Sequence, residues 1–354
     1  MDTNELKSTD GRTWDVVVIG GGAAGLSAAL LLTRVRRSVL VIDAGEPRNA
    51  PAVRVGAHNI LGREGISPLE LLRVGREEVA SYGGAVVNGR VERVERGGST
   101  FTITTQDGQR ARARRVLVTT GLTDELPDIP GLAERWGHDV IHCVYCHGWE
   151  ARDTKVGVLG NFHQALLFRQ MTDHVALFAH HAQAELTDEQ WEQLAALGIE
   201  VIHGAVTALE TDTEQDKLTG ARLVSGTVIP LDTLVVAPTF TARGGFLEDL
   251  GLTLNPHPAG SGVQVAVDPY GFTGVQGVWA AGNVSDVLAA VPQSAGAGST
   301  AGGAINMDLV LEDARGATEA REAASATPPF DGTMEAEVSQ RVLGTRAHGL
   351  EGPA

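Results

Sequence analysis

The most constraining feature of the sequence lies near its start, where an apolar run leads directly into a cluster of glycines. Residues 15–25 read DVVVIGGGAAG, and a stretch with helical character, Leu26 to Arg34, follows. The β-branched run predicts a strand, and Gly20, Gly22 and Gly25 have the GxGxxG spacing of a tight turn into a helix. In such a unit the first glycine permits the turn, the second admits a pyrophosphate and the third lets helix and strand pack closely.

A second predicted strand ends in an acid at the expected distance from this turn. Ser38 to Asp43 reads SVLVID, and Asp43 lies 18 residues after Gly25, where a carboxylate can bond the hydroxyls of a ribose. Ala23 and Ala24 are the small residues inside the turn. Strand, turn, helix and acid together predict a dinucleotide-binding unit of the α/β class. A glycine-rich turn in an unrelated α/β domain is the alternative interpretation.

Length and charge limit the classes of protein and partner. The 354 residues allow two or three domains, and 44 acidic against 28 basic residues give a formal net charge of -16. That average field repels phosphate groups, so we expect neither nucleic acid nor an anionic membrane as a partner. The start of the chain has no signal-peptide pattern, and the run Val16 to Leu32 is short for a membrane span and broken by glycines. We therefore expect a cytoplasmic protein.

The two cysteines of the chain, Cys143 and Cys146, form a CxxC pattern. This spacing lets two thiols close a small disulfide ring, and such motifs favour the thiolate that performs exchange. A zinc half-site with two of His138, His142 and His147 competes with this interpretation, but no second CxxC or HxxxH completes it, so we expect no metal. An inert structural disulfide is disfavoured in a reducing cytoplasm. Two unrelated buried thiols leave the spacing unexplained.

Two polar residues after the cysteines are candidates for proton transfer. His147 directly follows Cys146, and Glu150 stands three residues further on. Because a histidine has an unperturbed pKa near ~6.5, it can move protons to and from thiols at neutral pH. Glu150 could orient or assist it. The predicted catalytic residues are therefore Cys143, Cys146, His147 and Glu150.

Two later segments, taken with the motifs above, resemble those of a known family. Residues 116–121, VLVTTG, and 277–283, GVWAAGN, each predict a strand that ends in a small-residue turn. With the first glycine turn and the CxxC, they resemble the flavoprotein disulfide reductases, most closely the low-molecular-weight thioredoxin reductases. The resemblance implies an α/β fold of two Rossmann-like FAD/NAD(P)-binding domains, the second inserted in the first. It also implies FAD as the cofactor and a homodimer.

By this resemblance the FAD lies along the glycine turns. Asn283 stands where the family has an Asp, although an amide still donates and accepts hydrogen bonds there. Residues 292–304 resemble the segment near the isoalloxazine ring. The implied cofactor-binding residues are Gly20, Gly22, Ala23, Ala24, Gly25, Asp43, Thr120, Gly121, Gly282, Asn283 and Gln293. Cys146 would face the flavin, Cys143 would exchange with the substrate, and His147 replaces the family's acid–base Asp.

The second nucleotide unit departs from the pattern. Residues 155–160 predict a strand and 164–170 a helix, but Phe162 occupies the second-glycine position of GxGxxA. A further strand, 175–179, is followed by HHAQ at 180–183, where the family has arginines for the 2'-phosphate of NADPH. These residues argue against tight NADPH binding, although other basic residues of the unit could serve.

A CxxCHGxE motif with an eroded second site resembles the FAD-dependent dithiol oxidases of gliotoxin and holomycin biosynthesis, over about residues 14–311. This resemblance implies that a small dithiol is oxidised to a disulfide and that electrons pass through FAD to dioxygen. The alternative is an NADPH-dependent reductase of a thioredoxin-like protein, in which the same residues run in reverse. A third hypothesis is a redox-sensing flavoprotein without turnover.

The expected layout has two domains and a tail. A discontinuous FAD-binding domain, 1–121 and 241–311, encloses an NAD(P)-binding-like domain, 122–240, that carries the CxxC. Residues 312–354 are rich in Ala, Gly, Thr and charge and show no sustained apolar face. They predict a flexible tail that includes a short helix.

Overall fold

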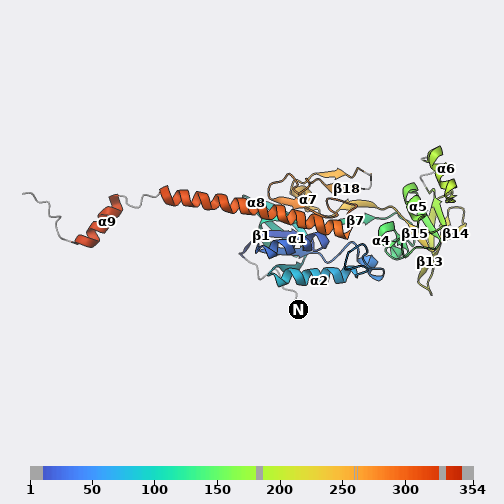
Figure 1. Ribbon diagram of the computed structural model, residues 1–354, viewed down its shortest axis with the longest axis horizontal. Helices are drawn as coiled ribbons and strands as arrows, with labels where there is room; N and C mark the ends of the chain where they lie inside the picture. Colours follow the sequence, from blue (N-terminus) through green and yellow to red (C-terminus); the bar gives the residue numbers. More distant parts are fainter. Residues whose placement is uncertain (1–10, 181–185, 259, 261, 327–331, 345–354) are drawn as a thin grey trace, which may run out of the picture. The chain divides into compact units, whose positions relative to one another are not determined.

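The computed structural model describes residues 11–180, 186–258, 260, 262–326 and 332–344. Residues 181–183 of the predicted HHAQ segment lie outside this described part. By their contacts, residues 1–306 and 307–354 form two separate compact units. Figure 1 shows the course of the chain, with the helices and strands labelled.

The first sheet has seven strands and contains the predicted glycine-turn unit. Parallel strands run in the order β3-β2-β1-β6, β19 lies parallel to the end of β6, and β5 and β4 continue the sheet antiparallel. Val16, Val17 and Val18 are fully buried, as expected where both faces of a parallel sheet are covered. The strands are β1 (Thr13–Ile19), β2 (Val39–Asp43), β3 (Ala85–Asn88), β4 (Val91–Gly97), β5 (Thr100–Thr105), β6 (Arg110–Val118) and β19 (Val278–Ala280).

Helices α1 and α8 pack against each other through small residues. A Cβ at Gly298 of α8 would lie 2.0 Å from the carbonyl oxygen of Ala24 in α1, so only glycine allows this approach. The beginning of α8 is thereby held beside the glycine turn.

The helices of this part are α1 (Ala23–Arg34), a 3-10 turn (Ala50–Arg54), α2 (Pro68–Ser81), α7 (Phe246–Asp249) and α8 (Val291–Ala326). None of the described helices is both long and apolar enough to cross a membrane.

A second sheet of five parallel strands has the order β11-β10-β9-β15-β8. It comprises β8 (Val140–Ile141), β9 (Val156–Leu159), β10 (Val175–Phe178), β11 (Glu200–Ile202) and β15 (Thr233–Val235). The accompanying elements are α3 (Leu132–Arg135), α4 (Val144–His147), α5 (Phe162–Phe168), α6 (Asp188–Ala196) and the antiparallel strands β12 (Val206–Asp212), β13 (Lys217–Leu223) and β14 (Val228–Pro230). The predicted α/β class with two Rossmann-like sheets is confirmed.

The chain passes between the parts that contain these two sheets twice, and both connecting segments contribute a strand to a four-stranded sheet. Its order is β17-β18-β16-β7, and β7 pairs antiparallel with β16. The strands are β7 (Leu122–Glu125), β16 (Thr239–Ala242), β17 (Leu254–Pro256) and β18 (Gly262–Val265). The chain leaves the first sheet after β6 and returns to it with β19, so the second sheet is an insertion. The predicted domain limits fall at β7 and within β16 and stay a proposal.

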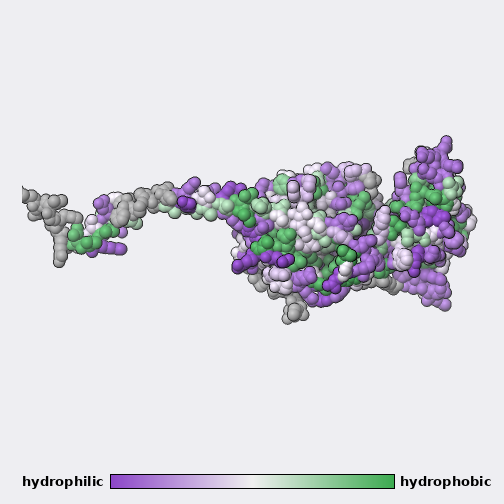
Figure 2. Space-filling model, viewed as in Figure 1, coloured by the Kyte–Doolittle hydropathy of each residue, from purple (hydrophilic) through white to green (hydrophobic). Residues whose placement is uncertain are grey.

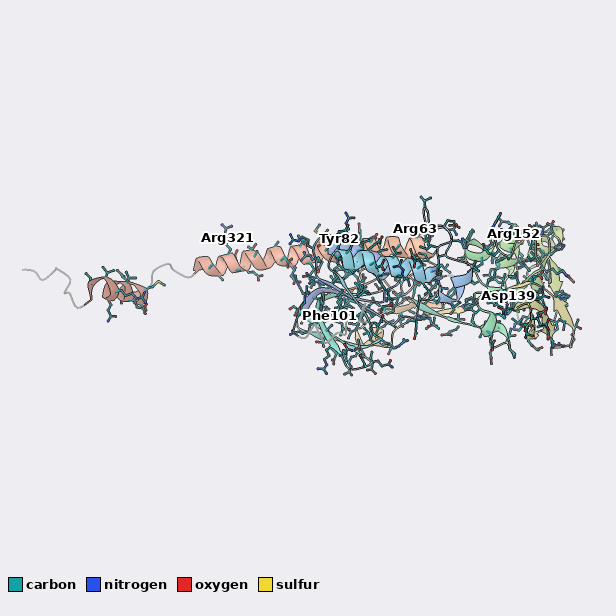
Figure 3. The ribbon with its side chains drawn as sticks, turned by 90° about the horizontal axis from the view of Figure 1, so that it is seen from below. Arg63, Tyr82, Phe101, Asp139, Arg152 and Arg321 are labelled. Carbon is teal, nitrogen blue, oxygen red and sulfur yellow. A yellow bond between two sulfur atoms is a disulfide. The ribbon has the colours of Figure 1, made fainter. Side chains whose placement is uncertain are left out.

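Each large sheet has its own core. Trp14, Phe101 and Val278 belong to the cluster at the first sheet, and Phe178 and Phe168 to two clusters at the second. Figure 3 labels Phe101 in the first part. On the face drawn in Figure 2, hydrophilic residues are interspersed with smaller hydrophobic patches.

The second compact unit, residues 307–354, is helical where it is described. It contains the later part of α8, which ends at Ala326, and α9 (Gly332–Leu343). This is more helix than the short helix that the composition predicted for 312–354. The flexibility of this segment stays a prediction.

Candidate active site

The two cysteines stand at the start of a one-turn helix. Cys143 precedes α4, Cys146 lies within it, and a disulfide joins them with the Cα atoms 5.2 Å apart. The backbone N–H groups of Cys146 and His147 donate to the carbonyl oxygen of Cys143 at 3.2 and 3.0 Å, which closes the turn. The helix ends at Gly148, where a Cβ would lie 2.4 Å from the carbonyl oxygen of Val144. The predicted disulfide pairing is confirmed.

His147 is half-buried at the end of α4. Its Nε2 atom is shielded from solvent and has no hydrogen-bond partner in the described part of the chain. Burial lowers the pKa of His147 below its ordinary value of 6.5; the charge of Glu150 opposes this shift and that of His58 adds to it. The ring is therefore neutral at neutral pH, the form that can accept a proton.

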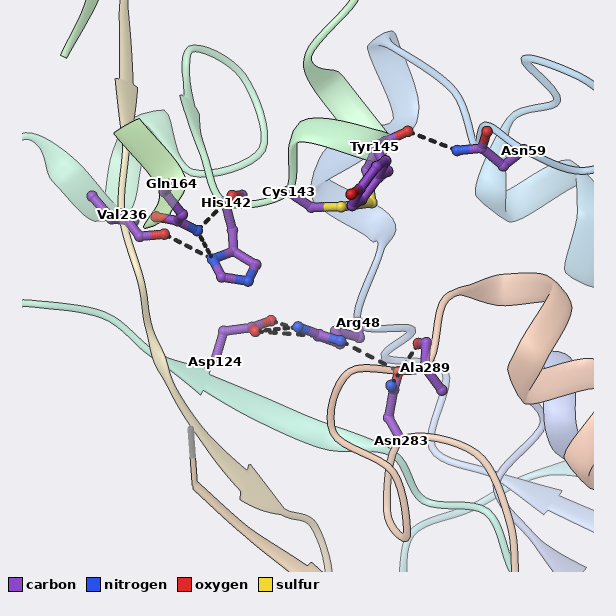
Figure 4. The surroundings of a disulfide bond; sticks show 11 residues. Arg48, Asn59, Asp124, His142, Cys143, Tyr145, Gln164, Val236, Asn283 and Ala289 are labelled. Carbon is purple, nitrogen blue, oxygen red and sulfur yellow. Dashed lines mark hydrogen bonds and ion pairs between the residues drawn. A yellow bond between two sulfur atoms is a disulfide. The ribbon is translucent and has the colours of Figure 1, made fainter. Parts of the chain in front are cut away.

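A loop after the 3-10 turn contacts the cysteine helix with groups that sequence reasoning did not find. The side-chain amide of Asn59 donates to the carbonyl oxygen of Tyr145 at 2.7 Å, as Figure 4 shows. His58 Nε2 lies 3.8 Å from Glu150 Oε1, and His58 Nδ1 lies 2.7 Å from Glu64 Oε1. The hydrogen bond to Glu64 raises the pKa of His58, with burial opposing and Glu150 adding. The charge of the predicted Glu150 thus acts on two histidines whose pKa values shift in opposite directions.

His142, the residue before the first cysteine, is held by three neighbours. Its Nδ1 lies 2.9 Å from the carbonyl oxygen of Val236 and 3.0 Å from the side-chain nitrogen of Gln164. The first contact requires a proton on Nδ1 and the second a lone pair, so only one of the two is a hydrogen bond in the neutral ring. The side-chain amide of Gln164 donates to the His142 carbonyl oxygen at 2.9 Å, and the buried ring of Phe240 lies edge-on with the centroids 5.4 Å apart. Burial lowers the pKa of His142. Sequence reasoning considered His142 only as a metal ligand.

An ion pair lies beside this histidine. Arg48 donates to both carboxylate oxygens of Asp124, with contacts of 2.7 to 3.2 Å, and its guanidinium stands 5.0 Å from the centroid of the Phe240 ring. A further contact of 3.4 Å runs from Arg48 Nη1 to Asn283 Oδ1. The Asn283 amide donates to the carbonyl oxygens of Ala289 and Asp286 at 2.8 and 3.1 Å. Asn283 is thereby fixed as both donor and acceptor (Figure 4).

In the first glycine turn, two of the three motif glycines have no room for a side chain, whereas the third faces open space. A Cβ at Gly20 would lie 2.3 Å from the carbonyl oxygen of Thr119, and one at Gly25 would lie 2.0 Å from that of Gly20. A Cβ at Gly22 would meet nothing within 4 Å. The backbone of Gly22 is therefore accessible to a ligand, and α1 begins directly behind it with Ala23 and Ala24.

The corresponding turn of the second sheet carries side chains at Phe162 and Asn161, where the first turn has glycines. Phe162 begins α5 and packs against the core of this sheet. The side-chain oxygen of Asn161 accepts from the backbone N–H of Gln164 at 3.0 Å, which satisfies one of the donors that a phosphate would use. Gln164 is engaged in turn with His142.

Comparisons with known proteins place most of the chain in one family. A profile of the pyridine nucleotide-disulphide oxidoreductases matches residues 14–302. The chain belongs to this family. The resemblance predicted from the motifs is thereby confirmed.

Individual relatives extend over most of the chain. Thioredoxin reductase tcpT of Claviceps purpurea is 32% identical over 317 residues, 84% of this chain and 95% of its own length. Thioredoxin reductase sirT of Leptosphaeria maculans is 30% identical over 322 residues, 85% of this chain and 95% of its own length. The crystal structure of HlmI is 44% identical with a TM-score of 0.82, and covers 90% of this chain and 99% of that chain. The chain is accordingly a flavin-dependent disulfide oxidoreductase.

The residues present fit FAD, the cofactor of the family. The open backbone at Gly22, at the start of α1, is a cradle that a side chain would otherwise fill. Asp43 ends β2, where Oδ1 accepts from the Gly21 N–H at 3.0 Å and Oδ2 pairs with Arg76. Because a carboxylate has about four acceptor sites, Asp43 retains capacity for ribose hydroxyls.

The other predicted cofactor residues lie at three places. Gly282 meets the first turn, since a Cβ there would lie 2.8 Å from that of Ala24. Gln293 is exposed in the first turn of α8. Thr120 instead donates to the carbonyl oxygen of Arg243 at 2.6 Å, and the Gly121 oxygen accepts from the Arg243 N–H at 3.0 Å. Thr120 and Gly121 thus join the two crossing segments; their contact with a cofactor stays a prediction.

The alternative of a zinc half-site finds no support in the described residues. No group of three or more His, Cys, Asp and Glu side chains there is arranged to hold a metal ion. The two cysteines that such a site needs are joined to each other.

Proposed function

We propose that this chain is a dithiol oxidase, which oxidises a small dithiol to a disulfide at Cys143 and Cys146 with dioxygen as the final acceptor. FAD, when bound, supplies the two-electron acceptor between the cysteines and dioxygen. The altered second turn carries this proposal. Phe162 stands at the second-glycine position, where a pyrophosphate needs a residue without a side chain, and Asn161 caps α5 and engages one of the backbone donors that a phosphate would use.

The roles of the site residues follow from their positions. A substrate thiolate attacks Sγ of Cys143, the Cys143–Cys146 bond breaks, and Cys146 leaves as a thiolate. The second substrate thiolate then attacks the substrate sulfur of the mixed disulfide and releases Cys143. Neutral His147 accepts a thiol proton, and the negative charge of Glu150 stabilises the imidazolium that forms.

The surface beside the disulfide supports an apolar dithiol as the substrate. Tyr145 and Trp149, on either side of Cys146, are 72% and 66% exposed. Trp149 is held under the guanidinium of Arg152, 4.3 Å from its ring centroid. Large exposed aromatic side chains next to a reactive group favour contact with an apolar ligand.

An NADPH-dependent thioredoxin reductase is the second candidate. The relatives tcpT and sirT are named thioredoxin reductases, and the second sheet keeps the strand order of a nucleotide-binding unit. In that function the same cysteines would deliver electrons to a thioredoxin-like protein.

Anaerobic titration of the flavin-loaded protein separates the two. We expect NADPH to leave the flavin absorbance unchanged and dithiothreitol to bleach it. Rapid, complete bleaching by NADPH would sink the oxidase proposal. In air, dithiothreitol should drive oxygen uptake that is abolished in Cys146→Ser while FAD stays bound. Oxygen uptake that persists in this variant would place the chemistry elsewhere, and no uptake by the wild type would favour the redox-sensing alternative.

The remaining predictions belong to the same proposal. We infer a cytoplasmic homodimer whose FAD-binding domain, 1–121 and 241–311, encloses the domain 122–240. Light scattering on the purified protein tests the dimer, and a monomer at micromolar concentration would contradict it.

A further inference from the structure

We propose that His142 is the proton acceptor for the substrate thiol that attacks Cys143. This assignment rests on the proposed disulfide exchange at Cys143. The residue precedes Cys143 in the chain, and Figure 4 shows its ring between the cysteine pair and the Arg48–Asp124 ion pair. His147 was the base expected from the sequence, but it follows the other cysteine.

The geometry around His142 leaves one ring nitrogen available. We assign the proton of the neutral ring to Nδ1, because the carbonyl oxygen of Val236 at 2.9 Å can only accept, while the Gln164 side-chain nitrogen, 3.0 Å from Nδ1, also donates to the His142 carbonyl oxygen. In the described residues Nε2 has no hydrogen-bond partner, and unlike Nε2 of His147 it is not sealed from solvent. Phe240 and Gln164 hold the residue in place. A neutral imidazole with its proton on Nδ1 and the lone pair of Nε2 open to solvent meets the requirement for a general base.

The charges that face His142 come from two other elements. Arg48, after β2, disfavours protonation of the ring, and Asp124 of β7 favours it. Because Arg48 and Asp124 neutralise each other in a bidentate pair, burial remains the largest influence, and it lowers the pKa of His142. The ring is therefore ready to accept a proton at neutral pH.

The resulting exchange is balanced in protons and electrons. Nε2 takes the proton of the first substrate thiol, the thiolate forms a bond to Sγ of Cys143, and the electron pair of the broken disulfide leaves on Cys146. The second substrate thiol gives its proton to His147 and attacks the substrate sulfur. Cys143 leaves with the electron pair and takes the proton back from His142.

The test measures flavin reduction without dioxygen. Flavin-loaded wild type and His142→Gln are mixed anaerobically with dithiothreitol in a stopped-flow instrument between roughly pH 5 and 9. We expect the wild-type rate to rise with pH to a plateau, with its inflection below 6.5. His142→Gln should be roughly 10²- to 10⁴-fold slower at neutral pH and should lose this inflection, because the thiol must ionise unaided. His174→Gln, an exposed histidine of the same domain, is the matched control and should behave as the wild type.

Two further measurements separate a proton acceptor from a structural residue. An aromatic dithiol, largely ionised near neutral pH, should reduce His142→Gln within about threefold of the wild-type rate. Asp124→Asn removes the anion that favours protonation of His142, so its inflection should move to lower pH even if His142→Gln fails to fold.

Three outcomes overturn the assignment: an unchanged inflection in His142→Gln with dithiothreitol, an equal loss of rate with both dithiols, or an inflection in Asp124→Asn that stays in place or moves up. If neither dithiol reduces the wild type, the proposed function itself fails, and this assignment with it.

Discussion

At the scale of single residues, the hydrogen bonds of Asn283 show why an Asn stands where the family has an Asp. Its amide N–H groups donate to two carbonyl oxygens, those of Ala289 and Asp286, while its oxygen accepts from Arg48. A carboxylate could make only the last of these contacts and would set an oxygen against two other acceptors. The amide therefore fastens the loop between β19 and α8 in a way that the usual Asp does not.

Asn283→Asp should accordingly destabilise the protein, although it restores the pattern of the family. We expect a loss of about 1–3 kcal/mol in the free energy of unfolding, since two carbonyl oxygens lose their donor. Urea unfolding followed by circular dichroism measures this loss. Asn59→Asp, whose amide makes a single exposed contact, serves as the control and should cost less. An Asn283→Asp protein as stable as the wild type would show that the Arg48 contact dominates.

At the scale of elements, the loop of residues 57–66 follows the 3-10 turn in the chain and contacts the cysteine helix through Asn59. Glu64 organises it by accepting from the Asn59 backbone N–H at 2.8 Å and pairing with His58. The pairing raises the pKa of His58 above 6.5. Since the folded pKa is the higher one, the contribution of this pair to stability is complete below pH 6.5 and is lost as the pH rises through the folded pKa.

Glu64→Gln tests this pH dependence. The pKa of His58, followed by NMR titration, should fall toward 6.5, because the hydrogen bond to Glu64 is its largest cause. At about pH 6 the amide hydrogens of residues 57–66 should exchange at least roughly twofold faster than in the wild type, and this difference should shrink toward pH 9. Glu77→Gln, in the exposed Arg73 pair of α2, is the control. A difference that grows with pH would contradict the assignment.

How far the sequence predicts these elements depends on how local their causes are. The turn at Gly20 to Gly25 and the CxxC were predictable because strand, glycine spacing and helix follow one another directly. The contacts of Asn59 with Tyr145 and of Arg48 with Asp124 join residues far apart in the chain, and Asn59 and Arg48 lie in loops whose composition signals nothing. His142 was noticed as a residue type, but its tautomer depends on the Val236 carbonyl, which only the fold brings near.

At the scale of the whole molecule, the chain is strongly acidic although its candidate site contains a cation. The chain carries a formal net charge of -16, whereas Arg48 lies beside His142 and is paired with Asp124. Because Arg48 is already neutralised by its partner, we expect the long-range field at the site to take the sign of the net charge. Such a field lowers the local concentration of anionic substrates and is screened by salt within about 10 Å at 0.1 M.

Two dithiols that differ only in one charge test this field. Dihydrolipoate is anionic and dihydrolipoamide is neutral, while their thiols are the same. Between roughly 10 and 150 mM salt we expect the anaerobic rate of flavin reduction by dihydrolipoate to rise about two- to tenfold, since screening removes the repulsion. The rate with dihydrolipoamide, the control, should stay nearly constant. A rate with dihydrolipoate that falls with salt would mean that Arg48 attracts anions despite Asp124, and Arg48→Gln should then reverse the trend. Equal slopes for both dithiols would instead assign the salt effect to the protein, because the charge of the substrate would play no part.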